Sequence, residues 1–248
     1  MDLKTFFQTY PKVAVAFSGG VDSAYLLYEA KLYAENVKGY FVKSEFQPQF
    51  ELDDALKIAS FANVEMEVIP LSILSSEKVV ENPQNRCYYC KKEIFSHILP
   101  HAKRDGFTVI LDGTNASDDV DNRPGFKALQ EMQVLSPLRL SGLTKDEVRK
   151  RSKEVGLETW KKPSYACLAT RIPTGTRIEK DYLTTTERSE AFLSSLGFSD
   201  FRIRYRNGSA LIQLREEQLL LFEENKTLIE KTLTQWYKSI ILDKETRK

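Results

Sequence analysis

Three cysteines are the side chains of this 248-residue chain whose chemistry is most distinctive. Cys87 and Cys90 lie three positions apart in NRCYYCKKEIF, and Cys167 lies in the irregular segment KKPSYACLATRIPTG. Residues three apart on a helix face the same way, and a helix N-terminus beside Lys91 and Lys92 favours the thiolate. Metal binding and sulfur chemistry are therefore both open, beside three buried thiols without chemistry.

The histidines do not complete a zinc site with these cysteines. Structural zinc usually takes four Cys or His ligands, and the only histidines, His97 and His101, lie well down the helix from Cys90. Three thiolates without an obvious fourth protein ligand suit an iron–sulfur cluster whose last iron is open to an outside ligand. Spacing alone leaves such a cluster and three unrelated thiols equally open.

A second stretch, AFSGGVDSAYLL, has the residues of a phosphate-binding loop. It follows the apolar run VAVAF and opens a helix, where backbone amides and the helix dipole favour an anion. Gly19 and Gly20 allow close approach of the backbone, Ser18 and Ser23 offer hydroxyls, and Asp22 lies in the first turn. An ordinary glycine turn capped by Asp22 is the alternative.

The loop differs from the two commonest nucleotide motifs. It lacks G-x-x-x-x-G-K-[ST], so no lysine of the loop reaches the terminal phosphates, and it lacks the dinucleotide spacing G-x-G-x-x-G. It matches the S-G-G-x-D-S loop of the ATP pyrophosphatases. A loop that grips the β- and γ-phosphates leaves the α-phosphorus open to attack, with pyrophosphate leaving. We therefore predict binding of ATP with Mg²⁺, and catalytic roles for Asp22 and Ser23. The predicted ATP site comprises Ala16, Phe17, Ser18, Gly19, Gly20, Asp22, Ser23, Lys43 and Gly113.

Strands that alternate with helices must position this loop. Apolar patterns predict strands at 13–17, 37–44, 64–71 and 107–114, and helices at 22–34, 51–63, 90–106 and 144–156. This order predicts an α/β fold with a doubly wound parallel sheet, whose ligand site lies beyond the carboxyl ends of the strands.

The pattern changes near residue 178. A helix at 184–197, strands at 201–206 and 209–214, a helix at 219–238 and an apolar stretch at 239–243 follow. We expect two domains, 1–177 for ATP and a smaller α+β domain at 178–248 for substrate or oligomerisation.

The charge balance and the apolar segments of the chain limit which partners it is expected to bind. The 36 Lys and Arg residues nearly balance the 35 Asp and Glu, so no overall positive field draws the chain to nucleic acid or to an anionic membrane. No leader-like N-terminus is present, and no segment approaches the roughly 20 apolar residues of a bilayer span. A soluble, cytoplasmic protein is expected, acting on a small molecule.

Three long stretches together resemble the LarE family of ATP-dependent sulfur transferases, which make the nickel-pincer nucleotide. These stretches are AFSGGVDS, NRCYYCKKEIFS with VILDGTNASDDVDNRPGFKAL, and PSYACLATRIPTGTRI with FRIRYRNGSALIQL, in this order. The resemblance covers almost the whole chain. It implies an adenine nucleotide alpha hydrolase-like pyrophosphatase domain and a small C-terminal domain. It also implies adenylation of a carboxylate of pyridinium biscarboxylic acid mononucleotide, followed by conversion to a thiocarboxylate.

The family has two branches that differ in the source of sulfur. In one, a single cysteine gives up its own sulfur and becomes dehydroalanine; in the other, three cysteines hold a [4Fe-4S] cluster that carries the sulfur. Cys167 matches the sacrificial position, and Cys87 and Cys90 supply the extra thiolates of the cluster branch. The resemblance thus implies that all three ligate a cluster, and that sulfide from an unidentified source attacks the adenylated carboxylate.

The resemblance also implies roles for arginines. Alternation along FRIRYR places Arg202, Arg204 and Arg206 on one face of a strand, where arginines can bind phosphate and carboxylate. In the family, arginines of this strand bind phosphate or substrate, which favours Arg202 and Arg204 over a merely solvated face. Arg171 either binds the same anion or hydrogen-bonds its own loop.

Other polar residues have less specific assignments. Asp118, Asp119 and Asp121 are expected to form a polar turn rather than a magnesium site, and Tyr88 and Tyr89 to pack rather than catalyse.

The sequence departs from the family pattern at two places. Gln213 stands where some relatives have an acidic residue, and the tail ILDKETRK lacks a glycine-rich extension, which puts an acidic metal or oligomer contact in doubt. A homo-oligomer is carried over from the relatives.

Two other readings remain. Within the fold, the chain could be a tRNA thiolase or an ammonia-using synthetase of the NAD synthetase kind, although a net charge of +1 offers little to RNA. In another class, it could be a nucleotide-binding zinc sensor without turnover.

Overall fold

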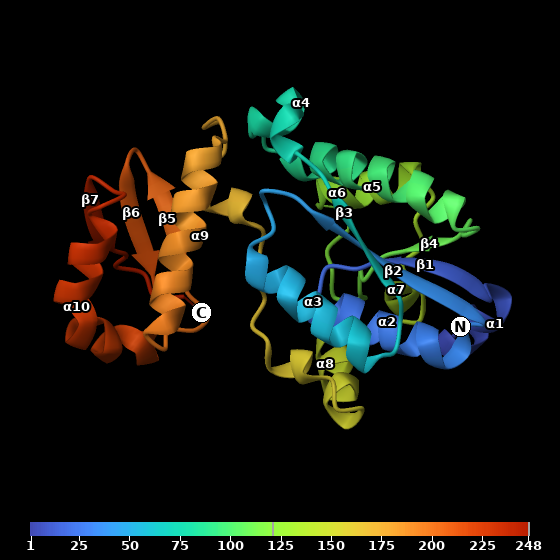
Figure 1. Cartoon of the computed structure of the whole chain (residues 1–248). Coiled ribbons are helices and arrows are strands. Elements are labelled where there is room, and N and C mark those ends of the chain that lie inside the picture. The colour runs from blue at the N-terminus through green and yellow to red at the C-terminus, as the bar shows by residue number, and fades with distance from the viewer. Residues whose placement is uncertain (121, 248) are drawn as a thin grey trace. The chain divides into compact units, whose positions relative to one another are not determined.

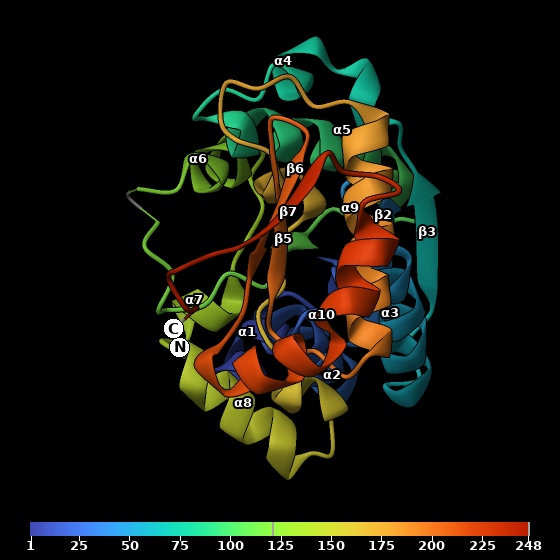
Figure 2. The same cartoon turned by 90° about the vertical axis from the view of Figure 1, so that its left-hand side faces the viewer.

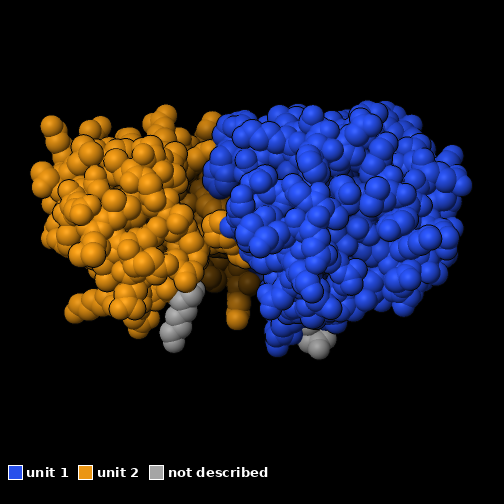
Figure 3. Space-filling model, turned by 90° about the horizontal axis from the view of Figure 1, so that it is seen from below, with its two compact units in different colours: residues 1–79, 85–162 blue, residues 80–84, 163–248 orange. Residues whose placement is uncertain are grey.

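The structure is a computed structural model that describes residues 1–120 and 122–247. These residues form two compact units, Met1–Val79 with Asn85–Lys162, and the described part of Val80–Gln84 with Pro163–Lys248 (Figure 3). The second unit therefore includes residues 163–177, which the sequence analysis placed in the first domain. Backbone hydrogen bonds from Gly175 to Asn82 (2.8 Å) and from Ile178 to Val80 (2.7 Å) hold the short segment in this unit.

A parallel four-stranded sheet forms the centre of the first unit (Figure 1). Its strand order is β3-β2-β1-β4, and every neighbouring pair is parallel. The strands are β1 (Lys12–Ala16), β2 (Asn36–Lys43), β3 (Met66–Pro70) and β4 (Ile110–Leu111). The α/β class and the parallel sheet predicted from the sequence are thus confirmed.

Alternation along the strands supplies both layers of helices with a core. Val13 and Val15 of β1 pack on one side with α1, α2, α3, α7 and α8, whereas Ala14 packs on the other with α5 and α6. The helices of this unit are α1 (Leu3–Thr9), α2 (Val21–Tyr33), α3 (Gln49–Phe61), α4 (Glu77–Val80, whose last residue belongs to the other unit), α5 (Arg86–Arg104), α6 (Pro124–Glu131), α7 (Pro137–Leu140) and α8 (Lys145–Glu154). Short 3₁₀ turns occupy Ile73–Ser75 and Glu158–Lys161.

Local sequence signals explain where α8 begins and ends. The Thr144 side chain accepts a hydrogen bond from the backbone of Glu147, and the Glu147 carboxylate accepts one from the backbone of Thr144, which forms a capping box. Gly156 follows the helix with φ +78°, a conformation that glycine adopts without steric cost.

The second unit is an α+β arrangement of three strands and two long helices (Figure 2). Strands β5 and β6 are antiparallel, and β6 and β7 are parallel. Ile203, Ala210 and Ile212 of the sheet share a core with residues of α9 and α10. The elements are α9 (Lys180–Ser195), β5 (Arg202–Arg206), β6 (Ser209–Gln213), α10 (Leu219–Leu233) and β7 (Ser239–Leu242), with 3₁₀ turns at Leu168–Arg171 and Glu216–Gln218.

The fourth strand is much shorter than the predicted range 107–114. Only Ile110 and Leu111 pair with β1, and the backbone of Asp112 donates to Leu135 at 2.9 Å. Helices α1 and α6 were not predicted, although Asp2 caps α1 and Pro124 occupies the first position of α6. Within the part of the chain that the structure describes, no helix combines the length and apolar character needed to cross a membrane.

Candidate active site

The phosphate loop connects β1 to α2 at the carboxyl edge of the parallel sheet. Gly19 has φ +72°, and a Cβ at this position would lie 3.0 Å from the backbone oxygen of Glu51. The Ser23 hydroxyl accepts a hydrogen bond from the Ser18 backbone (3.3 Å), lies 3.1 Å from the Ser18 hydroxyl and donates to the Gly20 carbonyl (3.2 Å). The loop is therefore a tight turn with serine hydroxyls at the N-terminus of a helix, a site suited to phosphate.

Two more predicted ATP-site residues, Lys43 and Gly113, follow or end neighbouring strands at the same edge. Lys43 is the last residue of β2, and its ammonium donates to the carbonyl of Gln47. Gly113 packs so closely on α2 that a Cβ there would lie 2.9 Å from the backbone nitrogen of Ser23. Ala16 is half-buried at the end of β1, and Phe17 is buried directly after it, where the loop begins.

Asp22 is held by two residues that the sequence analysis did not assign. The amide of Asn115 donates to its Oδ1 at 3.2 Å, and the ammonium of Lys145 forms an ion pair with its Oδ2. Asn115 follows β4, and Lys145 is the first residue of α8. Both lay in segments quoted for the family resemblance or for a capped helix, but only the fold shows that they meet at Asp22.

The acidic segment after β4 has the contacts expected of a polar turn. Asp118 accepts a hydrogen bond from the backbone of Asn115 (3.0 Å) and pairs with Arg123 (2.5 Å), while Asp119 accepts from the side-chain amide of Asn122 (2.8 Å). Asp121 lies outside the described residues. Among the residues that are described, no group of three or more His, Cys, Asp or Glu side chains is arranged to hold a metal ion.

Cys87 and Cys90 lie in the first two turns of α5, as the sequence predicted. Cys87 is exposed and Cys90 is half-buried, and neither forms a disulfide. Gly125 of α6 packs against Cys87, because a Cβ at Gly125 would lie 3.7 Å from the Cβ of Cys87. The neighbouring Tyr88 and Tyr89 rings are in edge contact at 5.3 Å, and the Tyr88 hydroxyl donates to Glu131 at 2.7 Å.

Cys167 belongs to the second unit and begins a 3₁₀ turn. Its carbonyl accepts hydrogen bonds from the backbone (3.0 Å) and the hydroxyl (2.8 Å) of Thr170, and Arg171 donates to the preceding carbonyl of Ala166 at 2.7 Å. The cysteine is half-buried, and these hydrogen bonds fix the backbone of its turn.

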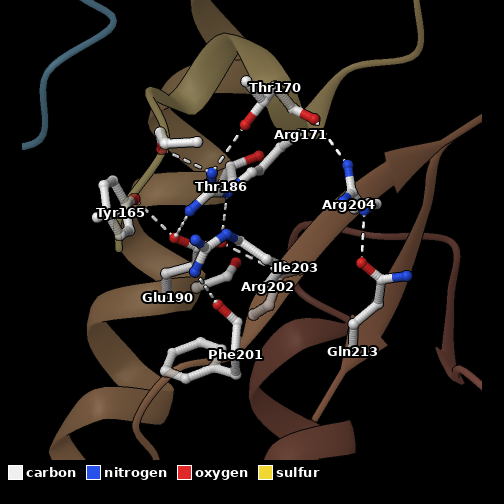
Figure 4. A network of polar contacts seen from close by, with 12 residues as sticks. Tyr165, Thr170, Arg171, Thr186, Glu190, Phe201, Arg202, Ile203, Arg204 and Gln213 are labelled. Atoms are coloured by element: carbon white, nitrogen blue, oxygen red, sulfur yellow. Dashed lines mark hydrogen bonds and ion pairs between the residues drawn. The ribbon is translucent and has the colours of Figure 1, made fainter. Parts of the chain in front are cut away.

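Arg171 is fully buried and forms a bidentate ion pair with Glu190 of α9 (2.8 and 3.0 Å; Figure 4). Glu190 also accepts hydrogen bonds from the Tyr165 hydroxyl (2.7 Å) and the backbone of Ile203 (3.0 Å). This network joins the cysteine segment to α9 and β5. The geometry therefore corresponds to the loop-supporting role considered for Arg171, rather than to an exposed anion site.

Arg202 and Arg204 of β5 make their direct contacts with neutral oxygens (Figure 4). Arg202 donates to the carbonyls of Phe201 (2.7 Å) and Ser164 (2.6 Å), and burial, together with the charge of Arg171, lowers its pKa to about 10. Arg204 donates to Gln213 (2.5 Å) and Thr170 (2.9 Å), and burial also lowers its pKa. After burial, the charges of neighbouring arginines, Arg171 and Arg247, also lower both pKa values, and this part of the shift corresponds to a positive local potential that favours a bound anion.

Several known proteins are similar in sequence to this chain. A scan against models of known protein families finds no match. The chain is 33% identical over 92% of its length to protein slr1717 of Synechocystis, of which it covers 85%. It is 33% identical over 84% of its length to the pyridinium-3,5-bisthiocarboxylic acid mononucleotide synthase of Lactiplantibacillus plantarum, of which it covers 76%. It is 28% identical over 61% of its length to the tRNA-specific 2-thiouridylase MnmA of Thermotoga maritima, and spans about half (54%) of that enzyme.

The parallel sheet with an S-G-G-V-D-S loop at its carboxyl edge defines a nucleotide-binding protein of the ATP pyrophosphatase class. Within this class, the chain belongs to the LarE family of ATP-dependent sulfur transferases. The family resemblance drawn from the sequence is confirmed.

Proposed function

We propose that this enzyme adenylates a carboxylate of pyridinium biscarboxylic acid mononucleotide and converts it to a thiocarboxylate, as a step toward the nickel-pincer nucleotide. The observation that carries the proposal is the phosphate loop at residues 17–23, tightly folded at the edge of the sheet, in a chain of this family. The relative from Lactiplantibacillus plantarum is named a pyridinium-3,5-bisthiocarboxylic acid mononucleotide synthase, and this name suggests the substrate.

The first half-reaction uses the loop to choose which bond breaks. Backbone amides at the start of α2, with the hydroxyls of Ser18 and Ser23, hold the β- and γ-phosphates. A carboxylate oxygen of the substrate bonds to the α-phosphorus, the bond to the bridging oxygen breaks, and pyrophosphate leaves with the electron pair. The product is an acyl adenylate, whose carbonyl carbon is activated for attack by sulfur.

Mg²⁺ fits the donor set around Asp22. Magnesium usually binds through one or two carboxylates, substrate phosphates and waters, rather than in a cage made of protein. Asp22, part-buried at the loop, would supply the carboxylate, and the ion would neutralise phosphate charge. Asn115 keeps the carboxylate oriented by its hydrogen bond to Oδ1.

The second half-reaction needs a sulfur donor, and we assign this role to the three cysteines. All three are thiols, none is fully buried, and two of them are one helical turn apart on α5. Cys87, Cys90 and Cys167 would hold a [4Fe-4S] cluster, which would carry sulfide from an external source as the nucleophile that displaces AMP. The hydrogen-bonded turn at Thr170 and Arg171 fixes the backbone that carries Cys167.

Arg204 is the residue of β5 best suited to bind the anionic substrate. It is half-buried, its pKa is lowered, and its partners Gln213 and Thr170 contribute neutral oxygens, so its charge can be used by a ligand. Arg202, on the same strand, is buried and adds to the positive potential near Arg204. A reducing, cytoplasmic setting is part of the proposal, since the cysteines must remain thiols. The homo-oligomeric assembly is carried over from the family resemblance alone.

Transfer of sulfur to tRNA is the second candidate, because the Thermotoga relative is named a tRNA-specific 2-thiouridylase. A net charge of +1 gives little attraction for an RNA backbone. An assay that offers each substrate in turn separates the two candidate functions.

The test supplies ATP, Mg²⁺ and sulfide under anaerobic conditions, with either the pyridinium mononucleotide or tRNA. The expected result is a mass increase of the pyridinium substrate by replacement of oxygen with sulfur, dependent on ATP, with no thiolation of tRNA. Ser23→Ala should greatly reduce pyrophosphate release, because its hydroxyl organises the loop. Thiolated tRNA with an unchanged pyridinium substrate would reject the proposal.

A further inference from the structure

The phosphate loop contains a negatively charged side chain, although its proposed ligand, ATP, is an anion. Between residues 17 and 23 the only ionisable side chain is Asp22, which is negative, whereas the triphosphate of ATP is strongly anionic. Backbone amides and a helix dipole provide partial charges of about half a unit. Other phosphate loops add a lysine of their own, which this loop lacks. Mg²⁺ held at Asp22 would neutralise part of the phosphate charge, and any cationic side chain that contacts the phosphates comes from another element.

Lys145 is a cation that reaches the loop from another element. Its ammonium pairs with Oδ2 of Asp22, and its side chain is 31% exposed, so the ammonium can change partners without unfolding anything. The backbone places it firmly: Lys145 follows the capping residue Thr144, and its amide donates to the Ser117 hydroxyl at 3.0 Å. The loop after β4 is fixed to the same point by the hydrogen bond from Ala116 to Leu143 (2.7 Å).

Two other lysines near this edge of the sheet have different contacts. The ammonium of Lys43 donates to the Gln47 carbonyl, and that of Lys91 lies 3.7 Å from Asp112. Among the described residues, therefore, Lys145 is the lysine seen in contact with the loop itself. Asp22 would still keep the hydrogen bond from Asn115 if the ammonium moved away.

We propose that Lys145 binds the β- and γ-phosphates of ATP and remains on pyrophosphate as it leaves. This inference rests on the proposed adenylation. Before ATP binds, the ammonium is paired with Asp22; phosphate oxygens then replace Asp22 as its partner. As the carboxylate oxygen bonds to the α-phosphorus, the bond to the bridging oxygen breaks and its electron pair leaves on pyrophosphate. The ammonium neutralises that growing charge.

Binding of inorganic pyrophosphate and of AMP, measured by calorimetry without magnesium, tests the assignment. Lys145→Gln keeps the aliphatic stem and removes the charge, and should weaken pyrophosphate binding by about tenfold to a hundredfold, the scale of a charge-assisted hydrogen bond. AMP binding should change by less than about threefold, since AMP lacks the two phosphates in question and a threefold change is under 1 kcal/mol. Lys145→Arg should restore much of the pyrophosphate affinity. Lys150→Gln, an exposed lysine on the same helix, is the matched control.

A double variant separates phosphate binding from simple neutralisation of Asp22. If Lys145 only cancels the charge of Asp22, then Asp22→Asn combined with Lys145→Gln should bind pyrophosphate like the wild type, which would overturn the proposal. Equal losses of AMP and pyrophosphate binding in Lys145→Gln would also overturn it, because they indicate a distorted loop. If Lys145→Gln loses pyrophosphate affinity as expected, but the wild type binds ATP without releasing pyrophosphate in the presence of the pyridinium substrate, the proposed adenylation is rejected and the lysine assignment is supported.

Discussion

At the scale of single residues, the site depends on a few side chains whose positions are set by distant parts of the chain. Lys145 and Asp22 are separated by 123 positions and Asn115 and Asp22 by 93, yet all three meet at one carboxylate. Arg171 similarly depends on Glu190, which lies 19 positions later on α9. These contacts decide which charges are available to a ligand and which serve the fold.

Gly113 gives the first prediction at this scale. Gly113→Ala should lower the free energy of unfolding by about 1–3 kcal/mol, because the new methyl would meet the Ser23 backbone nitrogen at 2.9 Å and backbone yields little. Pyrophosphate release should fall by about tenfold to a hundredfold, the cost of displacing reacting groups by about 1 Å. Urea unfolding and a pyrophosphate assay measure the two effects.

Gly39→Ala is the matched control, since its methyl would meet ordinary contacts at 3.5 Å or more inside β2. Pyrophosphate release by Gly113→Ala at the rate of this control would show that Gly113 does not position the loop.

Arg204 gives the second prediction. Arg204→Ala should weaken binding of the mononucleotide substrate by about 1.5–3 kcal/mol, the scale of a charge-assisted hydrogen bond, with ATP binding little changed. Arg206, two positions along the same face, is exposed and donates to the carbonyl of Tyr205. Arg206→Ala should cost less than about 0.5 kcal/mol, as for other solvated charges. Substrate titrations of both variants measure this, and equal affinities would show that Arg204 does not bind the substrate.

At the scale of elements, the phosphate site was predictable because its signals are local. An apolar strand, two glycines and a helix with an apolar stripe occur consecutively in the sequence, and β1 and α2 form within one residue of the predicted bounds. The helix 144–156 was also predictable, from Thr144, Glu147 and Gly156. Lys145 was not recognised as part of the site, because its role arises only when α8 packs beside α2. The burial of Arg171 was equally hidden, since charge alone does not reveal its partner.

The end of α5 carries an ion network that predicts a pH dependence. Hydrogen bonds from Arg104, then Lys38 and Tyr40, hold the pKa of Asp105 below its usual range. A carboxyl with a lower pKa in the folded state stabilises the fold at pH values above the unfolded pKa of about 3.9. This contribution is lost as pH falls through the folded pKa.

Asp105→Asn should therefore destabilise the protein at pH 6, and its difference from the wild type should shrink as pH falls from 5 toward 3. Urea unfolding at several pH values measures this, with Asp146→Asn, at an exposed site on α8, as the control. A difference that stays constant with pH would mean that the charge of Asp105 does not contribute.

At the scale of the whole molecule, the three cysteines come from two compact units. Cys87 and Cys90 belong to the unit that contains the phosphate loop, whereas Cys167 belongs to the unit that contains Arg204. A shared cluster would therefore link adenylation, substrate binding and sulfur delivery across the chain. A sacrificial cysteine would place the sulfur chemistry in the second unit alone.

These two arrangements predict different behaviour of single cysteine variants. With a cluster, Cys87→Ala, Cys90→Ala and Cys167→Ala should each lose the brown chromophore and sulfur transfer, because two thiolates hold a [4Fe-4S] cubane poorly. Pyrophosphate release should survive in all three, since adenylation needs no thiol. Anaerobic absorption spectra, the pyrophosphate assay and the mass of the used protein measure these outcomes. We expect Cys167 to remain intact after several turnovers with added sulfide. A dehydroalanine at position 167, with Cys87→Ala and Cys90→Ala still active for one turnover, would instead make Cys167 the sulfur donor.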